Sequence, residues 1–369
     1  MKTLNRSLVL LPLTFTLASL SASADPIVKQ YQSVRTSGMG GVKLLTGLYD
    51  ENFYGNPART MANDKFRITV FDLTLEGNSN LSTTANAASK SGDVLSNIGS
   101  TAGNNNHFRI QTSFPSVYIP AGDDGKNSYA FGLLTSTQGD IDLHRYFQPT
   151  FPVIADIGPA LSFARRFFPD NSLVVGTTLH ATYRAAFQQN FTLVDLIHGS
   201  NLPSINSASD GIILDDDLGA TYVLPIAPLD FKITAGAAIN NVLGGTTTLS
   251  VHLAPAKINP PTQPRTLGFG ASASRDSLGP FTNFLLSFEV QDIGNNPDGS
   301  LYRTIHIGSE ARFGILLPRI GINQGYVGAG LGIDLRHFTI DLATYGEELT
   351  LDSGISEDRR YVARIAFQI

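Results

Sequence analysis

Residues 172–187 read SLVVGTTLHATYRAAF, and this stretch decides the fold. Its odd-numbered residues, from Leu173 to Phe187, are apolar or nearly so, whereas the residues between them become small or polar and include His180 and Arg184. A period of two is typical of a β-strand, because successive side chains point to opposite faces. The run is about three times the usual strand length of ~5–6 residues. Such a long apolar face, opposite a histidine and an arginine, predicts a strand that crosses a bilayer.

The same alternation recurs in residues 229–240, 281–292, 303–314 and 326–336. A tilted strand needs ~9–11 residues to cross a membrane. A backbone surrounded by hydrocarbon must satisfy its own hydrogen bonds, so a sheet in that environment must close. The sequence therefore predicts an all-β fold, a transmembrane antiparallel β-barrel of about 14 strands, with 12 as the alternative. The expected strands are 65–77, 107–120, 127–139, 158–168, 172–188, 211–225, 229–242, 264–275, 281–292, 301–314, 319–324, 326–336, 337–346 and 358–369.

The connections between these strands alternate in length. Short, turn-forming stretches such as AGDDGKN, FPDN, PIAP and RDSLGP alternate with mostly long connections. Short periplasmic turns and longer outside loops are typical of outer-membrane barrels. The tightest place is 315–326, where we expect Pro318 to lie in a turn because proline cannot donate to a central ladder. The long connections are 78–106, 140–157, 189–210, 243–263 and 347–357.

The two ends of the chain agree with export to the bacterial outer membrane. Lys2 and Arg6 precede an apolar stretch and the small residues Ala22-Ser23-Ala24, which is the order of a secretory signal peptide. The expected mature chain begins near Asp25. The final residues, 359–369, alternate as in the C-terminal assembly signals of outer-membrane proteins, although this chain ends in Ile and those signals usually end in an aromatic residue.

Composition excludes several other classes of protein. The net charge of −5 gives no electrostatic case for nucleic-acid binding. The chain has no cysteine, so it has no disulfide framework and no cysteine nucleophile. No catalytic motif is present, and an outer-membrane lipase is disfavoured because no serine is marked as a partner for His180 or His306. The glycines of GAGLG at 328–332 alternate along an expected strand, whereas a dinucleotide-binding fingerprint opens a helix.

A segment without the two-residue period precedes the first strand. It contains Gly38-Met39-Gly40-Gly41 and, further on, Asn56-Pro57-Ala58. This arrangement resembles the N-terminal region of FadL-type outer-membrane transporters, and equally the related PorV and TraF-like barrels. The resemblance implies a fourteen-stranded barrel with a lumenal hatch, in which Gly40, Gly41, Asn56, Pro57 and Ala58 lie near a hydrophobic ligand. Arg59 departs from the pattern, because small residues are commoner there. The expected division is 1–24 signal peptide, 25–64 hatch and 65–369 barrel.

Two further groups of residues are candidate sites. Apolar residues in the outside loops predict a landing site for a hydrophobic ligand, or loops that pack on each other to seal the barrel; they are Phe147, Phe151, Phe191 and Leu193. Polar residues on the inward face predict charge pairing across the lumen rather than substrate selection; they are His180, Arg184, Lys232, His306, Glu310 and Arg312. Asp215-Asp216-Asp217 is a charge cluster rather than a metal site, since alternate residues face opposite ways.

These patterns lead to two hypotheses of function. The first is passive uptake of a hydrophobic small molecule, fatty-acid or hydrocarbon-like, through a hatch-gated lumen. The second is a PorV-like barrel that docks secretion or surface proteins and transports no solute. We expect no cofactor and no metal in either case. Outer-membrane lipid is the expected surrounding partner of the barrel.

Overall fold

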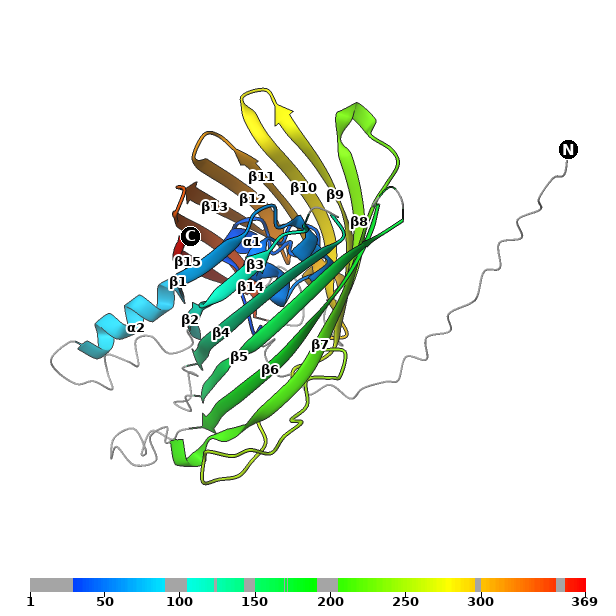
Figure 1. Ribbon diagram of the computed structural model, residues 1–369. Coiled ribbons are helices and arrows are strands. Elements are labelled where there is room, and N and C mark those ends of the chain that lie inside the picture. Colours follow the sequence, from blue (N-terminus) through cyan, green and yellow to red (C-terminus); the bar gives the residue numbers. More distant parts are fainter. Residues whose placement is uncertain are drawn as a thin grey trace, which may run out of the picture.

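The structure is a computed structural model that describes residues 29–89, 105–122, 125–142, 150–168, 170, 172–190, 205–295, 300–349 and 356–369. The expected signal peptide lies outside the described residues. The described chain forms one antiparallel sheet that closes on itself, because β15 pairs with both β14 and β1 (Figure 1). The predicted all-β barrel is confirmed.

Each expected strand is present, and the barrel has 14 strand positions rather than 12. Two short strands, β2 and β3, share one of these positions. The strands are β1 Arg67–Asn78, β2 Asn105–Thr112, β3 Ser116–Ile119, β4 Asn127–Asp142, β5 Thr150–Phe167, β6 Leu173–Asn190, β7 Ser209–Val223, β8 Lys232–Asn240, β9 Thr266–Leu278, β10 Phe281–Ile293, β11 Ile305–Arg312, β12 Leu316–Asn323, β13 Tyr326–Asp334, β14 Phe338–Glu348 and β15 Glu357–Gln368.

Strand β6 shows how the sequence period becomes an inside and an outside. Every even-numbered residue from Val174 to Ala186 is buried, and every odd-numbered residue from Leu173 to Phe187 is exposed or half-buried. Leu179 is 55% exposed, whereas its neighbour His180 is buried. The buried face looks into the barrel and the apolar face looks outward, as the opening stretch of sequence predicts.

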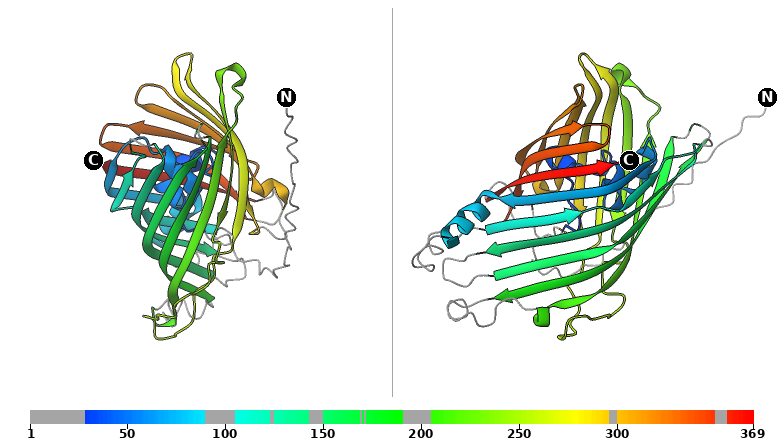
Figure 2. Two further views of the ribbon diagram at one scale, coloured as in Figure 1. Left: turned by 45° about the vertical axis from the view of Figure 1, so that its right-hand side comes forward. Right: turned by 60° about the vertical axis from the view of Figure 1, so that its left-hand side comes forward.

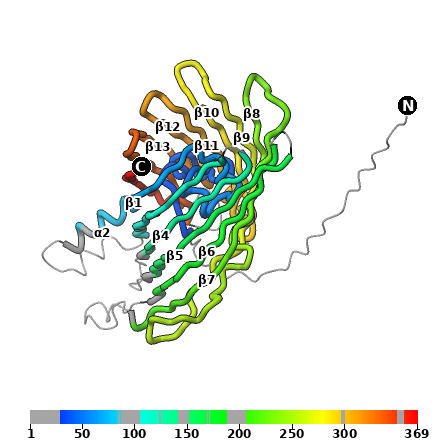
Figure 3. Tube along the Cα trace, in the orientation of Figure 1, coloured from blue at the N-terminus to red at the C-terminus, as the bar shows by residue number. Residues whose placement is uncertain are grey.

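The two ends of the barrel differ in their connections. Tight turns join β9 to β10 and β11 to β12 at one end, while β1 and β2 are joined at the other end by a long excursion that includes α2 Ser79–Ser89. Figures 2 and 3 show the β9–β10 and β11–β12 turns at one rim and α2 at the opposite rim, which also carries the two-residue turn between β12 and β13. None of the helices in the described residues is long and apolar enough to cross a membrane.

The second strand position is interrupted, which corrects the single strand expected over 107–120. Strand β4 pairs with β2 through Thr112–Thr135 and with β3 through Ser116–Gly132, so the β2–β3 side has one extra residue. Pro115 lies in the interruption and has no N–H to donate to a ladder. Residues 70–73 of β1 lack a ladder partner on this side.

One expected strand boundary and one expectation about a proline are also wrong. Strand β5 begins at Thr150 rather than at 158, and Pro152 and Pro159 lie within it. Pro318 lies inside β12 instead of in a turn. The ladder between β11 and β12 begins at Glu310–Arg319, so Pro318 stands just beyond it, where its missing N–H removes no bond from that ladder.

The N-terminal segment, defined here as residues 29–66, lies inside the barrel (blue in Figure 1). Most of its residues are buried, and they contact strands on all sides of the lumen. Its elements are α1 Val34–Gly38, η1 Tyr49–Phe53 and η2 Pro57–Ala62; the remaining short helices are η3 Ile205–Ser207, η4 Pro228–Asp230 and η5 Leu301–Thr304.

Candidate functional site in the lumen

Glycines of the barrel wall provide the space in which the N-terminal segment sits. A Cβ atom on Gly219 would lie 1.9 Å from Oδ1 of Asn56, and one on Gly176 would lie 2.5 Å from the carbonyl carbon of Pro57. A Cβ on Gly308 would lie 2.0 Å from the carbonyl oxygen of Met39. Contacts of this length are impossible for a side chain, so only glycine permits the segment to approach the wall so closely.

The tripeptide Asn56-Pro57-Ala58 starts the short helix η2. The Asn56 side chain accepts the backbone N–H of Ala58 at 3.0 Å, which is a standard cap of a helix N-terminus, and Pro57 occupies the first helical position. The Asn56 Nδ2 atom also donates to the carbonyl oxygen of Ala220 on β7 at 3.3 Å. The tripeptide therefore both shapes η2 and fastens it to the wall.

Gly40 and Gly41 turn the chain after α1. Their φ angles are +67° and +83°, in the left-handed region that favours glycine. A Cβ on Gly40 would lie 2.4 Å from the backbone nitrogen of Ile322 on β12. The carbonyl oxygen of Gly40 accepts a hydrogen bond from Nδ1 of His306 at 2.9 Å. Both glycines are needed for the backbone path as well as for the close packing.

Glu289 of β10 is the strongest anchor of the next turn. Its carboxylate accepts three successive backbone N–H groups, from Lys43 at 2.8 Å, Leu44 at 2.9 Å and Leu45 at 3.0 Å. Glu289 is fully buried. A buried carboxylate is stable only when hydrogen bonds replace its water, and the N-terminal segment supplies them.

Arg35 of α1 links the segment to β11, the strand next to β10. Its guanidinium donates to Glu310 of β11 at 2.8–3.1 Å, to Glu51 at 3.0 Å and to the carbonyl oxygen of Thr46 at 2.8 Å. Glu310 also accepts from Arg319 of β12 at 2.6 Å. The segment is thus held by charge-assisted bonds, which are stronger than neutral hydrogen bonds.

His180 and Arg184 project into the lumen from β6, as predicted. His180 donates from Nε2 to Asp217 at 3.0 Å, and its ring stacks on Tyr54 of the N-terminal segment with centroids 4.5 Å apart. Arg184 makes a bidentate pair with Asp156 of β5, at 2.7 and 2.8 Å. These charge pairs join neighbouring strands along the inner face of the wall, β5 with β6 and β6 with β7, so they are not the pairs across the lumen that the sequence predicted.

A second charged cluster lies where β1 and β15 close the barrel. Both ring nitrogens of His107 face carboxylates at 2.8 Å, Nε2 facing Glu76 and Nδ1 facing Asp140. Since carboxylates only accept hydrogen bonds, this geometry favours the doubly protonated ring. Arg360 pairs with Glu347 at 2.7 Å. The cluster makes this part of the lumen polar and joins strands distant in sequence.

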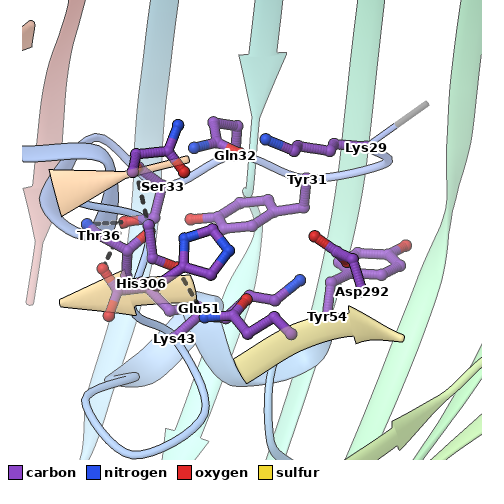
Figure 4. Close-up of a pocket in the computed structure, with 13 residues that line it drawn as sticks. Lys29, Tyr31, Gln32, Ser33, Thr36, Lys43, Glu51, Tyr54, Asp292 and His306 are labelled. Atoms are coloured by element: carbon purple, nitrogen blue, oxygen red, sulfur yellow. Dashed lines mark hydrogen bonds between the residues drawn. The ribbon is translucent and has the colours of Figure 1, made fainter. Parts of the chain in front are cut away.

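A small pocket lies beside the N-terminal segment, at the end of the barrel where β10 leads into residues 294–304 (Figure 4). Lys29, Lys43, Tyr54, Asp292 and His306 are among the residues that line it. His306 donates from Nδ1 to Gly40, so the neutral ring leaves Nε2 as an acceptor, and this buried atom has no hydrogen-bond partner in the structure. Because the pocket is small and most of its lining side chains are polar, it suits ordered water better than a hydrocarbon.

The remaining predicted site residues are distributed differently. Lys232 is exposed at the start of β8, and Arg312 is half-exposed and pairs with Asp334 at 2.6 Å. Asp215 and Asp217 are buried on the inner face while Asp216 faces outward, as alternation predicts. No group of metal-binding side chains occurs in the described residues. The side chain of Phe151, and all of Phe147, Phe191 and Leu193, lie outside what the structure describes.

The comparisons with known proteins agree on the fold. No family model matches the sequence, and no curated protein matches it. Among solved structures, the Ralstonia pickettii toluene transporter TbuX superposes with a TM-score of 0.51 at 14% identity, covering 92% of this chain and 98% of TbuX. The Pseudomonas putida toluene transporter TodX gives 0.51 at 12% identity, covering 92% and 97%. The deltaS2 mutant of TodX, a monoaromatic hydrocarbon channel, gives 0.52 at 12% identity, covering 91% and 97%.

The chain has the FadL-type fold. This fold agrees with the resemblance stated from the sequence and with the expected location in the bacterial outer membrane. In the usual orientation of outer-membrane barrels, the rim with the β9–β10 and β11–β12 turns is periplasmic and the rim with α2 is extracellular. The polar pocket lies toward the rim that carries α2, because Asp292 and Asn323, which line it, stand at the ends of β10 and β12 on that side.

Sequence reasoning did not single out Arg35, Glu51 or Arg319. Arg35 meets Glu310 across 275 residues of sequence, so no local pattern joins this pair, and Arg319 binds the same Glu310 carboxylate from the wall. The wall glycines that contact the N-terminal segment could have been found from the sequence. Gly176, Gly219 and Gly308 all occupy inward positions of alternating strands, where a missing side chain leaves room for another segment.

Proposed function

We propose that this FadL-type barrel mediates passive uptake of hydrophobic small molecules, fatty-acid or hydrocarbon-like, across the outer membrane. The observation that carries the proposal is the shared fold with toluene and monoaromatic hydrocarbon channels over more than 90% of the chain. The closed wall and the segment seated in its lumen support it further, because such a segment blocks free passage of polar solutes. We propose that residues 29–66 act as the hatch, and that Asn56, Pro57 and Ala58 shape it.

The test is substrate uptake in a strain from which the gene is deleted. Radiolabelled toluene and a long-chain fatty acid are supplied separately, and initial uptake is measured with the gene absent, restored, and replaced by Leu179→Ala as a matched lipid-facing control. Restoration of uptake for either compound, by the wild type and by Leu179→Ala alike, is the expected result. Equal uptake with and without the barrel for both compounds would overturn the proposal.

A docking role, without a transported solute, is the second candidate. The polar lining of the lumen favours it, because the buried inward residues of β1 and β15 include Glu76, Arg360 and Arg364 rather than an apolar path. The discriminating measurement is what purifies with the barrel in mild detergent. A stoichiometric protein favours docking, whereas a bound apolar compound identified by mass spectrometry favours uptake.

A further inference from the structure

Residues 241–263, which connect β8 to β9, form a cover over the exposed edge of β7. The ladder between β7 and β8 ends at Leu218–Ile239, so residues 209–217 of β7 lack a neighbouring strand on that side. The connection takes the place of that strand. Backbone hydrogen bonds join Ile212 and Leu249 in both directions, at 3.0 and 3.1 Å, and Val242 donates to Asp216 at 2.8 Å.

Aspartates of β7 hold this connection in place. Asp215, on the inner face, accepts the N–H groups of Leu243 at 2.8 Å and Gly245 at 2.6 Å. Asp217 accepts the N–H of Asn241 at 2.7 Å. The connection is therefore an ordered part of the wall, with its backbone fixed at several points.

Part of the connection lies on the outer face of the barrel. Asp210 is paired with Ala185, whose odd-numbered position on β6 faces outward, so the Asp210 carboxylate faces outward too. That carboxylate is 0% exposed. It accepts from the hydroxyl of Tyr183 at 2.7 Å, from the N–H of Ala254 at 3.1 Å and from the N–H of Leu253. Residues 253 and 254 thus cover it from outside.

This arrangement is the one that contact with lipid requires. A carboxylate that meets hydrocarbon must have protein donors, because no water replaces them. Asp210 has them, and the other outward carboxylate of β7, Asp216, accepts from the hydroxyl of Thr177 at 2.6 Å. Meanwhile the connection exposes large apolar side chains, with Leu249 at 47% and Leu253 at 77%.

The level of the connection matches the outer edge of the membrane. Leu249 lies opposite Ile212, ten residues along β7 from Tyr222, which is next to the periplasmic end of that strand. Ten residues span roughly 33 Å along a strand, or about 23 Å along the membrane normal at a tilt of about 45°. The apolar band of an outer-membrane barrel is about 25 Å tall. Leu249 is therefore continuous with the outward apolar row formed by Leu214 and Leu218.

We propose that the outer part of this connection, residues 249–258, is seated in the outer leaflet, where Leu249, Val251, Leu253 and Ile258 contact lipid acyl chains. Lys257 is exposed beside them and is placed to reach anionic lipid headgroups. The connection then acts as a membrane-embedded piece of wall that supports the long extracellular half of β7. The inference is independent of whether the barrel transports a solute.

Single tryptophans test the proposal directly, because the chain contains no tryptophan. Leu249→Trp and Leu253→Trp are reconstituted in phosphatidylcholine bilayers with and without acyl-brominated phosphatidylcholine, which quenches only residues near the acyl chains. Leu179→Trp, on the outer face of β6, is the control for lipid contact. Leu301→Trp, in the exposed helix η5 at the same rim, is the control for solvent. Retained heat-modifiable mobility verifies that each variant is folded.

The expected result is that brominated lipid quenches Leu249→Trp and Leu253→Trp by the same factor as Leu179→Trp, while acrylamide quenches mainly Leu301→Trp. Quenching of both test variants by acrylamide alone would place the connection in water and overturn the proposal. Protection from both quenchers would show that protein covers the surface, which overturns it as well.

Discussion

Leu179 is the residue at which the bilayer acts most directly. Its side chain is 55% exposed on the outer face of β6, where it is paired with Leu161 of β5 and with Asp216 of β7. We expect Leu179→Arg to lower the free energy of unfolding by ~2–4 kcal/mol, because the charge must enter hydrocarbon. The measurement is denaturant unfolding in lipid bilayers. Leu229→Arg, at an exposed position in the β7–β8 turn, is the matched control and should change little; equal costs at both positions would contradict the assignment of faces.

Glu289 is the residue that holds residues 43–45 of the N-terminal segment against the wall. Glu289→Ala removes the acceptor of three N–H groups, and each hydrogen bond to a charged group is worth roughly 1.5–3 kcal/mol. We expect faster amide exchange at residues 43–45 and a higher conductance in planar bilayers. Glu357→Ala, at an exposed position on β15, should leave both unchanged. An unaltered conductance of Glu289→Ala would argue against gating by this segment.

Gly219 shows how one missing side chain positions an element. A methyl group there would lie 1.9 Å from Asn56, so Gly219→Ala should displace η2 and lower stability by ~1–3 kcal/mol, as overpacking does. Gly122 has nothing within 4 Å of an added Cβ, so Gly122→Ala is the control. Denaturant unfolding gives the stability, and limited proteolysis of residues 29–66 reports the displacement. An equal loss of stability in both variants would show that Gly219 is not needed to make room for Asn56.

At the scale of elements, the sequence period predicted the strands well where both neighbours are regular. The alternation of β6 requires only that one face meets the polar lumen and the other meets lipid, and the sequence shows both faces. The errors fall at prolines. Pro115 interrupts the second strand position, whereas Pro318 is accepted inside β12 because the neighbouring ladder has already ended. Whether a proline breaks a strand depends on where the adjacent strand stops, and that is a property of the sheet.

At the scale of the whole molecule, closure of the barrel brings the charges of distant strands together. Arg364 of β15 donates to Asp72 of β1 at 2.6 Å and to Asp50 of the N-terminal segment at 3.1 Å. Arg364→Leu leaves two buried carboxylates without their cation, and we expect a loss of ~3–5 kcal/mol in denaturant unfolding. Arg359→Leu removes a partly exposed pair with Glu357, so it should cost at most ~1 kcal/mol. Comparable losses for both would show that closure does not rely on Arg364.

The sequence by itself determined the barrel, its number of strands to within two, and the face on which each alternating residue lies, because a bilayer imposes one rule on every strand. It also marked Gly40, Gly41 and Asn56-Pro57-Ala58 by resemblance. Only the tertiary structure decided how the N-terminal segment is held in the lumen, since Arg35, Glu289 and Gly219 meet their partners across long separations in sequence. The position of residues 241–263 over β7 was also decided only by the tertiary structure. It arises because β8 ends before β7 does and leaves an edge of β7 that must be paired.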